Sequence, residues 1–387
     1  MKQKTKTKIK ALSLFANIGV AEAYLEHIGV EVIAANELIK RRADLYQRIY
    51  PKTKMYCGDI FSDEVQSALT EVALANDVNT IIATPPCQGM STAGRQELDD
   101  YRNTLFLPVI KLVKAIRPKF IFIENVPLFL STDILYYGER KFIIDIIKEE
   151  LGEDYTINCN VANTADYGVP QTRERAIILI TRKDQGFIWE LPCKDKRQVT
   201  MRDAIGDLPS IDPYVRDVSE AELLELFPEY YEKEQRALAV SPWNFPPHHI
   251  KRQVVTMMHT PTGQSAFANP EEFKPKRENG TTCKGFFNTY KRQEWDIPAY
   301  TVTMDNRKIS SQNNVHPGRY LGTDENGNAI YSDARALTIY ELMRIMSLPD
   351  DWALPKNTPA AFLRSIIGEG IPPLFVKKVF ENLLRNL

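Results

Sequence analysis

The residue best suited to chemistry is Cys87, in the segment Thr84-Pro85-Pro86-Cys87-Gln88-Gly89-Met90-Ser91. It follows an apolar run at 80–83 that reads as a buried strand. The two prolines fix two φ angles and remove two N–H donors, so the strand must end before the cysteine. Open α/β sheets bind ligands at the carboxyl ends of their strands. The segment therefore predicts a thiol beside a ligand, although a lone cysteine is more commonly a small packing residue.

A carboxyl group and two guanidinium groups stand at comparable positions further along the chain. Glu124 ends a very hydrophobic run, where burial should raise its pKa and favour the protonated form. Arg173 and Arg175 come just before another apolar run. Each of these groups alone could be an ordinary surface charge. Because all of them stand at strand ends on one rim of the predicted sheet, we expect them to form one site with Cys87.

The elements that must position these groups alternate regularly over residues 9–182, which is typical of a doubly wound sheet. Apolar runs predict strands at 11–15, 30–35, 54–57, 80–84, 120–124, 155–161 and 175–180. Apolar spacing predicts helices at 20–28, 38–50, 63–74, 104–116 and 141–150. The expected fold class is therefore α/β, with a doubly wound, mostly parallel sheet.

A second candidate site follows the first predicted strand, in the loop Phe15-Ala16-Asn17-Ile18-Gly19. A strand, a turn and a helix in this order direct backbone N–H groups towards a ligand. Asn17 replaces the first glycine of a G-x-G pattern, and Asn tolerates the left-handed backbone next best after Gly. Glu37 and Asp59, at the next two strand ends, suit ribose hydroxyls and a base amine. The pattern indicates a nucleotide-like cofactor, with a tight turn flanked by surface carboxylates as the alternative.

The amino-acid composition excludes few classes of binding partner. The chain has 387 residues, with 49 basic and 50 acidic side chains, so its net charge does not indicate nucleic-acid binding. Charge is nevertheless divided, because residues 201–240 are mainly acidic and 241–320 mainly basic, and local patches make phosphate contacts. Five cysteines without a CxxC pair favour a reducing, cytoplasmic setting without a zinc site. No apolar run is long enough for a membrane span, and we expect a monomer.

In their order, these segments resemble motifs of the DNA (cytosine-5) methyltransferase family. The matching segments are 15–19, Pro86-Cys87-Gln88, Glu124-Asn125-Val126, Gln171-Thr172-Arg173-Glu174-Arg175, Arg335-Ala336-Leu337-Thr338 with Arg344 and Pro349-Asp350, and Gly368-Glu369-Gly370-Ile371-Pro372-Pro373. The match covers about 9–182 and 333–387. Two residues depart from the family pattern, because Asn17 replaces a usual glycine and Glu369 stands where Asn is more usual.

The resemblance implies methylation of cytosine carbon 5 in a short double-stranded DNA sequence. The enzyme would be of the bacterial restriction-modification type, use S-adenosylmethionine, release S-adenosylhomocysteine and need no metal. Cys87 would attack carbon 6 of a flipped base, Glu124 would bind ring nitrogen 3, and Arg175, supported by Arg173, the exocyclic oxygen. The cofactor residues would be Phe15, Ala16, Asn17, Ile18, Gly19, Glu37, Asp59, Ile60, Pro86, Glu369, Gly370 and Ile371. Methylation would protect host DNA from a cognate restriction endonuclease, without requiring contact with it.

The resemblance also implies two domains: 1–182 with 360–387 for catalysis and cofactor binding, and an irregular, β-rich target-recognition domain at 183–359. The helix expected at 372–387 would pack back onto the first domain. A hairpin is expected at Asn279-Gly280 and a strand at 301–303. Histidines 248, 249, 259 and 316 are expected to pack or to contact phosphate. The expected DNA contacts are Ser91, Arg95, Gln96, Lys251, Arg252, Lys291, Arg292, Arg307 and Lys308.

An RNA cytosine-5 methyltransferase with the same fold stays open, as does a catalytically silent DNA-binding homologue, although both Cys87 and Glu124 are present. An amino-methylating enzyme is disfavoured because Pro85-Pro86 is followed by Cys87 and not by an aromatic ring. A nicotinamide dehydrogenase is disfavoured because the full G-x-G-x-x-G is missing.

Overall fold

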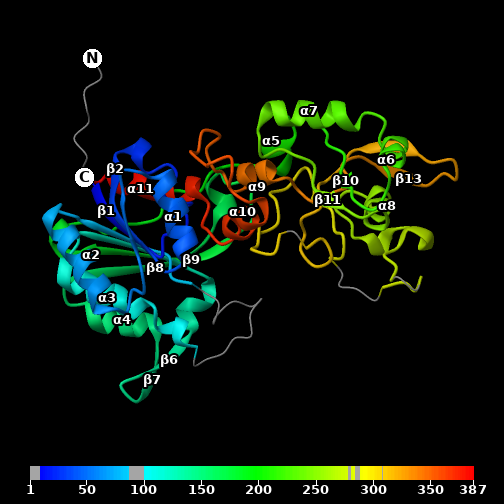
Figure 1. The fold of residues 1–387 in the computed structure, drawn as a ribbon. Coiled ribbons are helices and arrows are strands. Elements are labelled where there is room, and N and C mark those ends of the chain that lie inside the picture. Colours follow the sequence, from blue (N-terminus) through cyan, green and yellow to red (C-terminus); the bar gives the residue numbers. More distant parts are fainter. Residues whose placement is uncertain (1–8, 87–99, 278–279, 284–287, 307) are drawn as a thin grey trace.

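The computed structural model describes residues 9–86, 100–277, 280–283, 288–306 and 308–387. Seven strands form one sheet in the order β3-β2-β1-β4-β5-β9-β8 (Figure 1). Neighbouring strands from β3 to β5 pair parallel, whereas β9 is antiparallel to both β5 and β8. The prediction of a mostly parallel α/β sheet is confirmed. The strands are β1 (Ile9–Leu14), β2 (Val30–Glu37), β3 (Lys54–Cys57), β4 (Thr80–Ala83), β5 (Phe120–Asn125), β8 (Tyr155–Asn163) and β9 (Glu174–Arg182).

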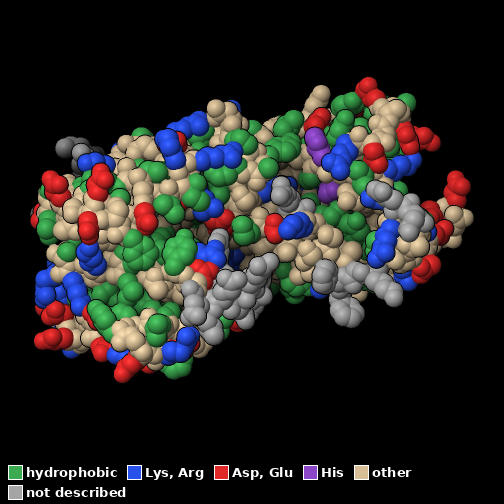
Figure 2. Space-filling view, turned by 60° about the horizontal axis from the view of Figure 1, so that its bottom comes forward, with side chains coloured by type: hydrophobic (Ala, Val, Ile, Leu, Met, Phe, Trp, Pro, Cys, Tyr) green, Lys and Arg blue, Asp and Glu red, His purple; other side chains and the backbone are tan. Residues whose placement is uncertain are grey.

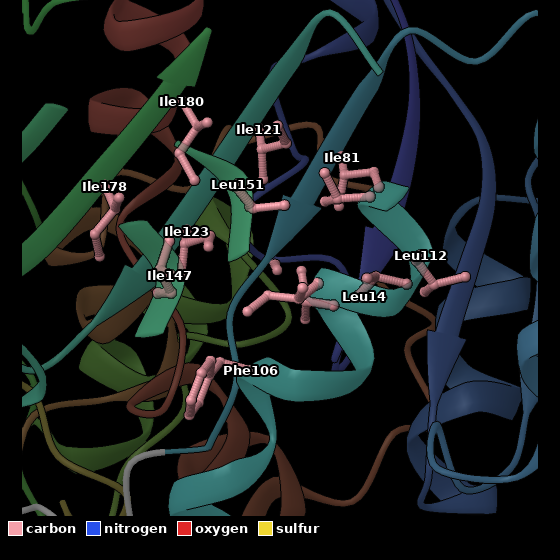
Figure 3. Packing of buried hydrophobic residues seen from close by; sticks show 14 of the residues in the cluster. Leu14, Ile81, Phe106, Leu112, Ile121, Ile123, Ile147, Leu151, Ile178 and Ile180 are labelled. Atoms are coloured by element: carbon pink, nitrogen blue, oxygen red, sulfur yellow. The ribbon is translucent and has the colours of Figure 1, made fainter. Parts of the chain in front are cut away.

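Three helices cover one face of this sheet: α2 (Asp63–Ala75), α3 (Phe106–Ile116) and α4 (Ile143–Leu151) (Figure 1). Their apolar side chains meet those of the strands in one buried cluster, shown in Figure 3. Side chains alternate between the two faces of a strand. Ile121 and Ile123 of β5 therefore join this cluster, while Phe120 and Phe122 belong to the cluster on the opposite face.

The carboxyl-terminal helix α11 (Pro373–Leu384) covers that opposite face. Its buried Phe375, Val376, Val379, Phe380 and Leu383 form one cluster with β1, β5 and β9. Trp189, fully buried, joins the cluster, and its Nε1 donates to the Val379 carbonyl at 3.2 Å. The last helix thus packs on the sheet built by the first half of the chain. The boundaries at 182 and 359 stay a prediction.

The helix predicted at 20–28 is wrong. Residues 20–25 form turns, and only Glu26–Ile28 is helical, as a short 3₁₀ turn. Successive backbone bonds here join residues three apart, such as Leu25 N to Glu22 O at 2.8 Å. The reason is that Glu22 is buried and accepts hydrogen bonds from Ser13 and Tyr46. Helical spacing of apolar residues cannot anticipate an inward-facing carboxyl group.

One hairpin was not predicted. Strands β6 (Asp133–Tyr136) and β7 (Glu139–Phe142) pair antiparallel and extend away from the sheet (Figure 1). Their turn uses Tyr137 and Gly138, both at positive φ. The segment has no Asn-Gly or Asp-Gly signal, and several of its side chains are exposed, so the alternating pattern of a half-buried strand is missing.

Much of the chain between β9 and α9 forms a second group of elements, on the right in Figure 1. Its two small sheets pair β10 (Tyr214–Val215) with β11 (His248–His249) and β12 (Tyr320–Thr323) with β13 (Ala329–Tyr331). Four helices accompany them: α5 (Met201–Ile205), α6 (Glu220–Leu226), α7 (Tyr230–Val240) and α8 (Lys251–Met258). Where the hairpin was expected, Lys276 and Thr282 form an antiparallel bridge and Arg277 N donates to the Thr281 carbonyl at 2.8 Å; Asn279 itself lies outside the described residues.

The strand predicted at 301–303 is absent. Val302 N donates to Gln171 Oε1 at 3.0 Å, and Thr301 Oγ1 donates to the Thr172 carbonyl at 2.6 Å. These side-chain hydrogen bonds take the place of the backbone hydrogen bonds of a β-ladder. Gln171 and Ala299 form an isolated β-bridge beside them. The segment is held against the residues that precede β9.

Two further helices connect the halves of the molecule: α1 (Lys40–Ile49), after β2, and α10 (Ala360–Ile367), near the end. Together with α5 and α9 (Ile339–Ile345) they bury an apolar cluster that includes Ile18 and Val20. The loop after β1 is thus packed against the carboxyl-terminal segment of the chain.

Candidate active site and cofactor loop

The reversed direction of β9 brings the predicted catalytic groups together. The start of β9 lies beside the end of β5, because Asn125 pairs with Ala176 and Glu124 with Ile177. Strand β4 ends next to β5, at the same rim. Residues 84–86, Glu124 and Arg175 therefore share one edge of the sheet, as expected from the sequence.

Glu124 and Arg175 form a largely buried ion pair at this edge. Arg175 Nε lies 2.8 Å from Glu124 Oε1, and the Glu124 side chain is 9% exposed. Burial raises the pKa of Glu124, while the positive charges of Arg175 and Arg173 oppose the rise. The carboxyl group is thus more easily protonated than in water, and a protonated carboxyl can donate a hydrogen bond.

Asn125, which the predicted site residues do not include, holds the turn before Cys87. Its Nδ2 donates to the Pro85 carbonyl at 3.1 Å. Thr84 Oγ1 donates to the Phe15 carbonyl at 3.2 Å. This bond joins the same turn to the loop at residues 15–19, the candidate cofactor loop. The sequence signal was present, because Asn125 directly follows Glu124 in the matching motif. Cys87, Ser91, Arg95 and Gln96 lie outside the described residues.

Arg173 occupies a different place from Arg175. Its side chain is buried, Nη1 donates to the Val302 carbonyl at 2.9 Å, and Nη2 donates to the carbonyls of Gly368 and Glu369 at 3.1 and 3.3 Å. The guanidinium group therefore joins β9 to two distant backbone segments. The hydrogen bonds of Arg173 thus go to backbone carbonyls, whereas Arg175 pairs with Glu124.

The cofactor loop has a strained, well-braced backbone. Phe15, Asn17 and Gly19 all have positive φ, near 58°, 51° and 80°. Asn17 N donates to Glu37 Oε2 at 2.9 Å, which ties the loop to the end of β2. A Cβ atom at Gly19 would lie 2.1 Å from the Tyr50 ring, so only glycine fits there. The left-handed residues turn the chain sharply at the carboxyl end of β1.

Two carboxylates lie at strand ends beside this loop. Glu37 ends β2 and is buried, with Oε1 accepting from Ile39 N at 2.8 Å. Asp59 follows β3 and is exposed. Ile60, expected against an adenine ring, is buried in the core cluster beneath α2 and α3. The carboxylates are therefore placed as expected, whereas most of the Ile60 side chain is core.

The segment 368–371 closes against the same loop. A Cβ atom at Gly368 would lie 2.1 Å from the Thr303 carbonyl oxygen, so this position must be glycine. Ile371 is buried with α11. The Glu369 carboxylate accepts from Asn17 Nδ2 at 3.2 Å and pairs with Arg42 at 2.8 Å. The two residues that depart from the family pattern are thus in direct contact.

A buried acid beneath the loop was missed by sequence reasoning. Glu22 accepts hydrogen bonds from Ser13 Oγ and Tyr46 OH, and burial raises its pKa to about 7. Near it, Tyr50 OH donates to the Gly19 carbonyl at 2.6 Å. The hydrogen bonds of Glu22 and Tyr50 therefore connect β1, the loop at 15–19 and α1.

The predicted DNA-binding residues differ in how exposed their side chains are and in whether neighbouring side chains pair with them. Arg252 and Lys308 are exposed and Lys251 is partly exposed; Lys251 pairs with Glu222 and Lys308 with Asp305. Lys291 donates to Tyr300 OH at 2.8 Å. Arg307 lies outside the described residues. A surface cavity of about 590 Å³ is lined by Asp217, Ile250, Lys251, Arg252, Val255, Thr256, Glu272, Phe273, Lys274 and Lys276.

Arg292 is wrong as a DNA contact. It is 0% exposed and donates to the carbonyls of His316, Met257 and Asp333. Burial lowers its pKa to about 9. A guanidinium group surrounded by backbone carbonyls cannot reach phosphate, so Arg292 is structural.

Charge on the visible face of the molecule is mixed. Figure 2 shows Lys and Arg side chains interspersed with Asp and Glu on this face, so they do not form one patch. His249 and His316 are buried, which lowers the pKa of each to about 4, and His259 stacks on Phe273. Within the described ranges, no helix is long and apolar enough to cross a bilayer, and no group of His, Cys, Asp and Glu could hold a metal ion.

Comparison with known proteins agrees with this geometry. The family model for C-5 cytosine-specific DNA methylases matches residues 9–385. The Type II methyltransferase M1.HgaI of Avibacterium volantium is 42% identical, over 99% of both chains. M1.HphI of Haemophilus parahaemolyticus, also a Type II methyltransferase, is 27% identical over 97% of this chain and 86% of its own.

Solved structures share the fold. A candidate DNA modification methyltransferase from an E. coli prophage superposes with a TM-score of 0.66 at 20% identity, over 97% of this chain and 99% of its own. The Entamoeba histolytica methyltransferase EhMeth gives a TM-score of 0.60 at 14% identity, over 98% and 99%. The chain therefore belongs to the C-5 cytosine-specific DNA methylases and is a DNA cytosine-5 methyltransferase of the Type II kind.

Proposed function

We propose that this enzyme methylates carbon 5 of a flipped cytosine within a short duplex sequence, with Cys87 as the nucleophile. The observation that supports this most directly is the buried Glu124–Arg175 pair at the rim where residues 84–86 lead to Cys87. S-Adenosylmethionine supplies the methyl group as an electrophile when bound.

The proposed roles of the side chains follow from cytosine chemistry. Carbon 5 is a poor nucleophile, so the Cys87 thiolate first forms a bond to carbon 6, which makes the ring electron-rich. Protonated Glu124 donates to ring nitrogen 3, and Arg175 donates to the exocyclic oxygen. After methylation, water takes the proton from carbon 5, the electron pair of that bond re-forms the double bond between carbons 5 and 6, and the bond between sulfur and carbon 6 breaks, which regenerates the Cys87 thiolate.

The residues at the cofactor loop fit S-adenosylmethionine. Glu37 and Asp59 present carboxylates at neighbouring strand ends, which suit ribose hydroxyls and the adenine amine. Asn17 Oδ1 is buried and has no hydrogen-bond partner among the described residues, so a donor on the ligand could satisfy it. Residues 15–19, Pro86 and 369–371 would complete the site.

The base must leave the helix before Cys87 can reach it, because carbons 5 and 6 lie inside the duplex stack. We assign target recognition to residues 183–359 and closure over the flipped base to residues 92–96. Protection of host DNA from a cognate endonuclease, in the cytoplasm, is the role we assign to the reaction.

Replacement of the nucleophile tests the proposal. Cys87→Ala should abolish methyl transfer to duplex DNA, measured with radiolabelled cofactor, while duplex binding in a gel-shift assay is retained. A duplex carrying 5-fluorocytosine should form a covalent adduct with the unchanged enzyme and none with the variant. Turnover by Cys87→Ala would refute the assignment.

The target sequence is best found by bisulfite sequencing of DNA from cells that express the enzyme. Methylated positions should share one short sequence and should vanish with Cys87→Ala. Methylation of transfer RNA but not of duplex DNA would instead favour an RNA substrate.

A further inference from the structure

Three side chains from distant parts of the sequence meet above the cofactor loop. Arg42 Nη1 lies 2.8 Å from Glu369 Oε2, and Arg42 Nη2 lies 2.9 Å from Glu369 Oε1. Asn17 Nδ2 donates to Glu369 Oε2 at 3.2 Å. The carboxylate therefore receives a two-pronged guanidinium contact and an amide contact at once, which is the geometry of a strong charge-assisted pair.

The contact is sheltered from solvent. The Arg42 and Glu369 side chains are 20% and 22% exposed, so water screens their attraction less than at an open surface. Burial raises the pKa of Glu369 and Glu37 adds to the rise, whereas Arg42 and Asn17 oppose it. The neighbouring Arg41 lies over the Phe362 ring of α10 at 3.9 Å, so α1 holds the carboxyl-terminal segment at two adjacent points.

The contact also explains why Asn17 can replace glycine. Its φ of 51° is left-handed, which costs a non-glycine residue free energy unless its side chain is held locally. The amide nitrogen must face the carboxylate, because two oxygens would repel each other. Glu369 thus offsets the strain that Asn17 introduces into the loop.

We infer that Arg42, Glu369 and Asn17 form a latch that holds the two walls of the cofactor pocket, 15–19 and 368–371, in their binding geometry before the cofactor arrives. Arg42 and Glu369 are positioning residues, Asn17 both positions the loop and offers Oδ1 to the ligand, and the inference rests on the proposed cofactor site. Because the segments 15–19 and 368–371 are already held in place, the cofactor does not have to order them when it binds. The latch therefore lowers the entropy cost of binding and raises cofactor affinity.

Calorimetric titration of the full chain with S-adenosylhomocysteine tests the latch. Arg42→Met and Glu369→Gln should each weaken binding by about tenfold, the effect of losing one charge-assisted contact. The double variant should weaken binding by no more than about tenfold, because both changes break the same contact. The KM for S-adenosylmethionine should rise by a factor similar to that for Kd, and kcat should fall by a smaller one.

Asp154→Asn is the matched control. It removes the Arg117–Asp154 pair, 2.9 Å apart, which precedes β5 and β8 at the opposite edge of the sheet. Cofactor affinity should stay unchanged in this variant. Additive losses in the Arg42 and Glu369 series, or equal weakening by Asp154→Asn, would overturn the latch alone. Absence of binding by the unchanged enzyme would overturn the proposed cofactor site as well.

Discussion

At the scale of single residues, function depends on side chains whose burial changes their chemistry. Glu124 is close to a guanidinium group, yet burial still raises its pKa. Glu22 has hydroxyl partners but no cationic partner among the described residues. The two carboxyl groups therefore share a tendency to hold a proton, one at the rim where the base would bind and one beneath the cofactor loop.

Glu22 should make stability depend on pH. Its folded pKa of about 7 exceeds the value of 4.5 expected when the chain is unfolded, so the folded state keeps a proton that the unfolded state releases. Its contribution is complete below pH 4.5 and is lost as pH rises through about 7. Glu22→Gln, which stays neutral, should flatten this dependence. Melting temperatures of both proteins at pH 5, 6, 7 and 8 measure it, and parallel curves would contradict the prediction.

At the scale of elements, the seven strands of the main sheet were predictable because most of them are apolar runs bounded by polar or turn residues, β8 with its three asparagines being the clearest exception. The carboxyl ends of these strands place residues 84–86, Glu124 and the carboxylates of Glu37 and Asp59 at one rim of the sheet. The structure has them there. The periodicity of apolar residues could not predict that β9 runs antiparallel to β5. This direction is what brings Arg175 to Glu124.

The failures share a physical cause: the sequence does not reveal which polar groups are buried. Glu22 lies inside and prevents a helix at 20–28. Arg292 looks like a phosphate contact but donates to three backbone carbonyls. Residues 301–303 alternate like a strand, but the Gln171 side chain takes the place of a neighbouring strand. In each case a long-range hydrogen bond outweighs local pattern.

The turn after α10 should tolerate no side chain at its first position. A Cβ atom at Gly368 would lie 2.1 Å from the Thr303 carbonyl oxygen and 2.8 Å from Met304 N, which are backbone atoms. Gly368→Ala must therefore displace the turn that carries Glu369. We expect at least tenfold weaker cofactor binding by calorimetry. Gly327→Ala is the control, since a Cβ atom there meets open space; its φ of 84° is positive, whereas that of Gly368 is −72°. Unchanged affinity in Gly368→Ala would contradict this reading.

At the scale of the whole molecule, the two ends of the described chain meet on one sheet. Helix α11 packs on β1, β5 and β9, and the segment before it contacts the loop at 15–19 through Glu369. Phe380→Ala, in the middle of that contact, should lower the free energy of unfolding by about 3–5 kcal/mol. Urea denaturation followed by tryptophan fluorescence measures the change, because Trp189 lies 5.2 Å from Phe380. A loss below about 1 kcal/mol would mean that α11 is not part of the folded core.

This arrangement has a consequence for protein synthesis. A ribosome makes residues 368–384 after all seven strands of the main sheet, so until then the nascent chain lacks both the segment that contacts the loop at 15–19 and the cover for Phe120, Phe122 and Leu179. Until α11 has been made, the growing polypeptide exposes an apolar sheet face and is a natural client for chaperones. A premature stop codon before α11 would accordingly yield an aggregating product and not a partly active enzyme. Methyl transfer can therefore begin only in chains that already contain α11.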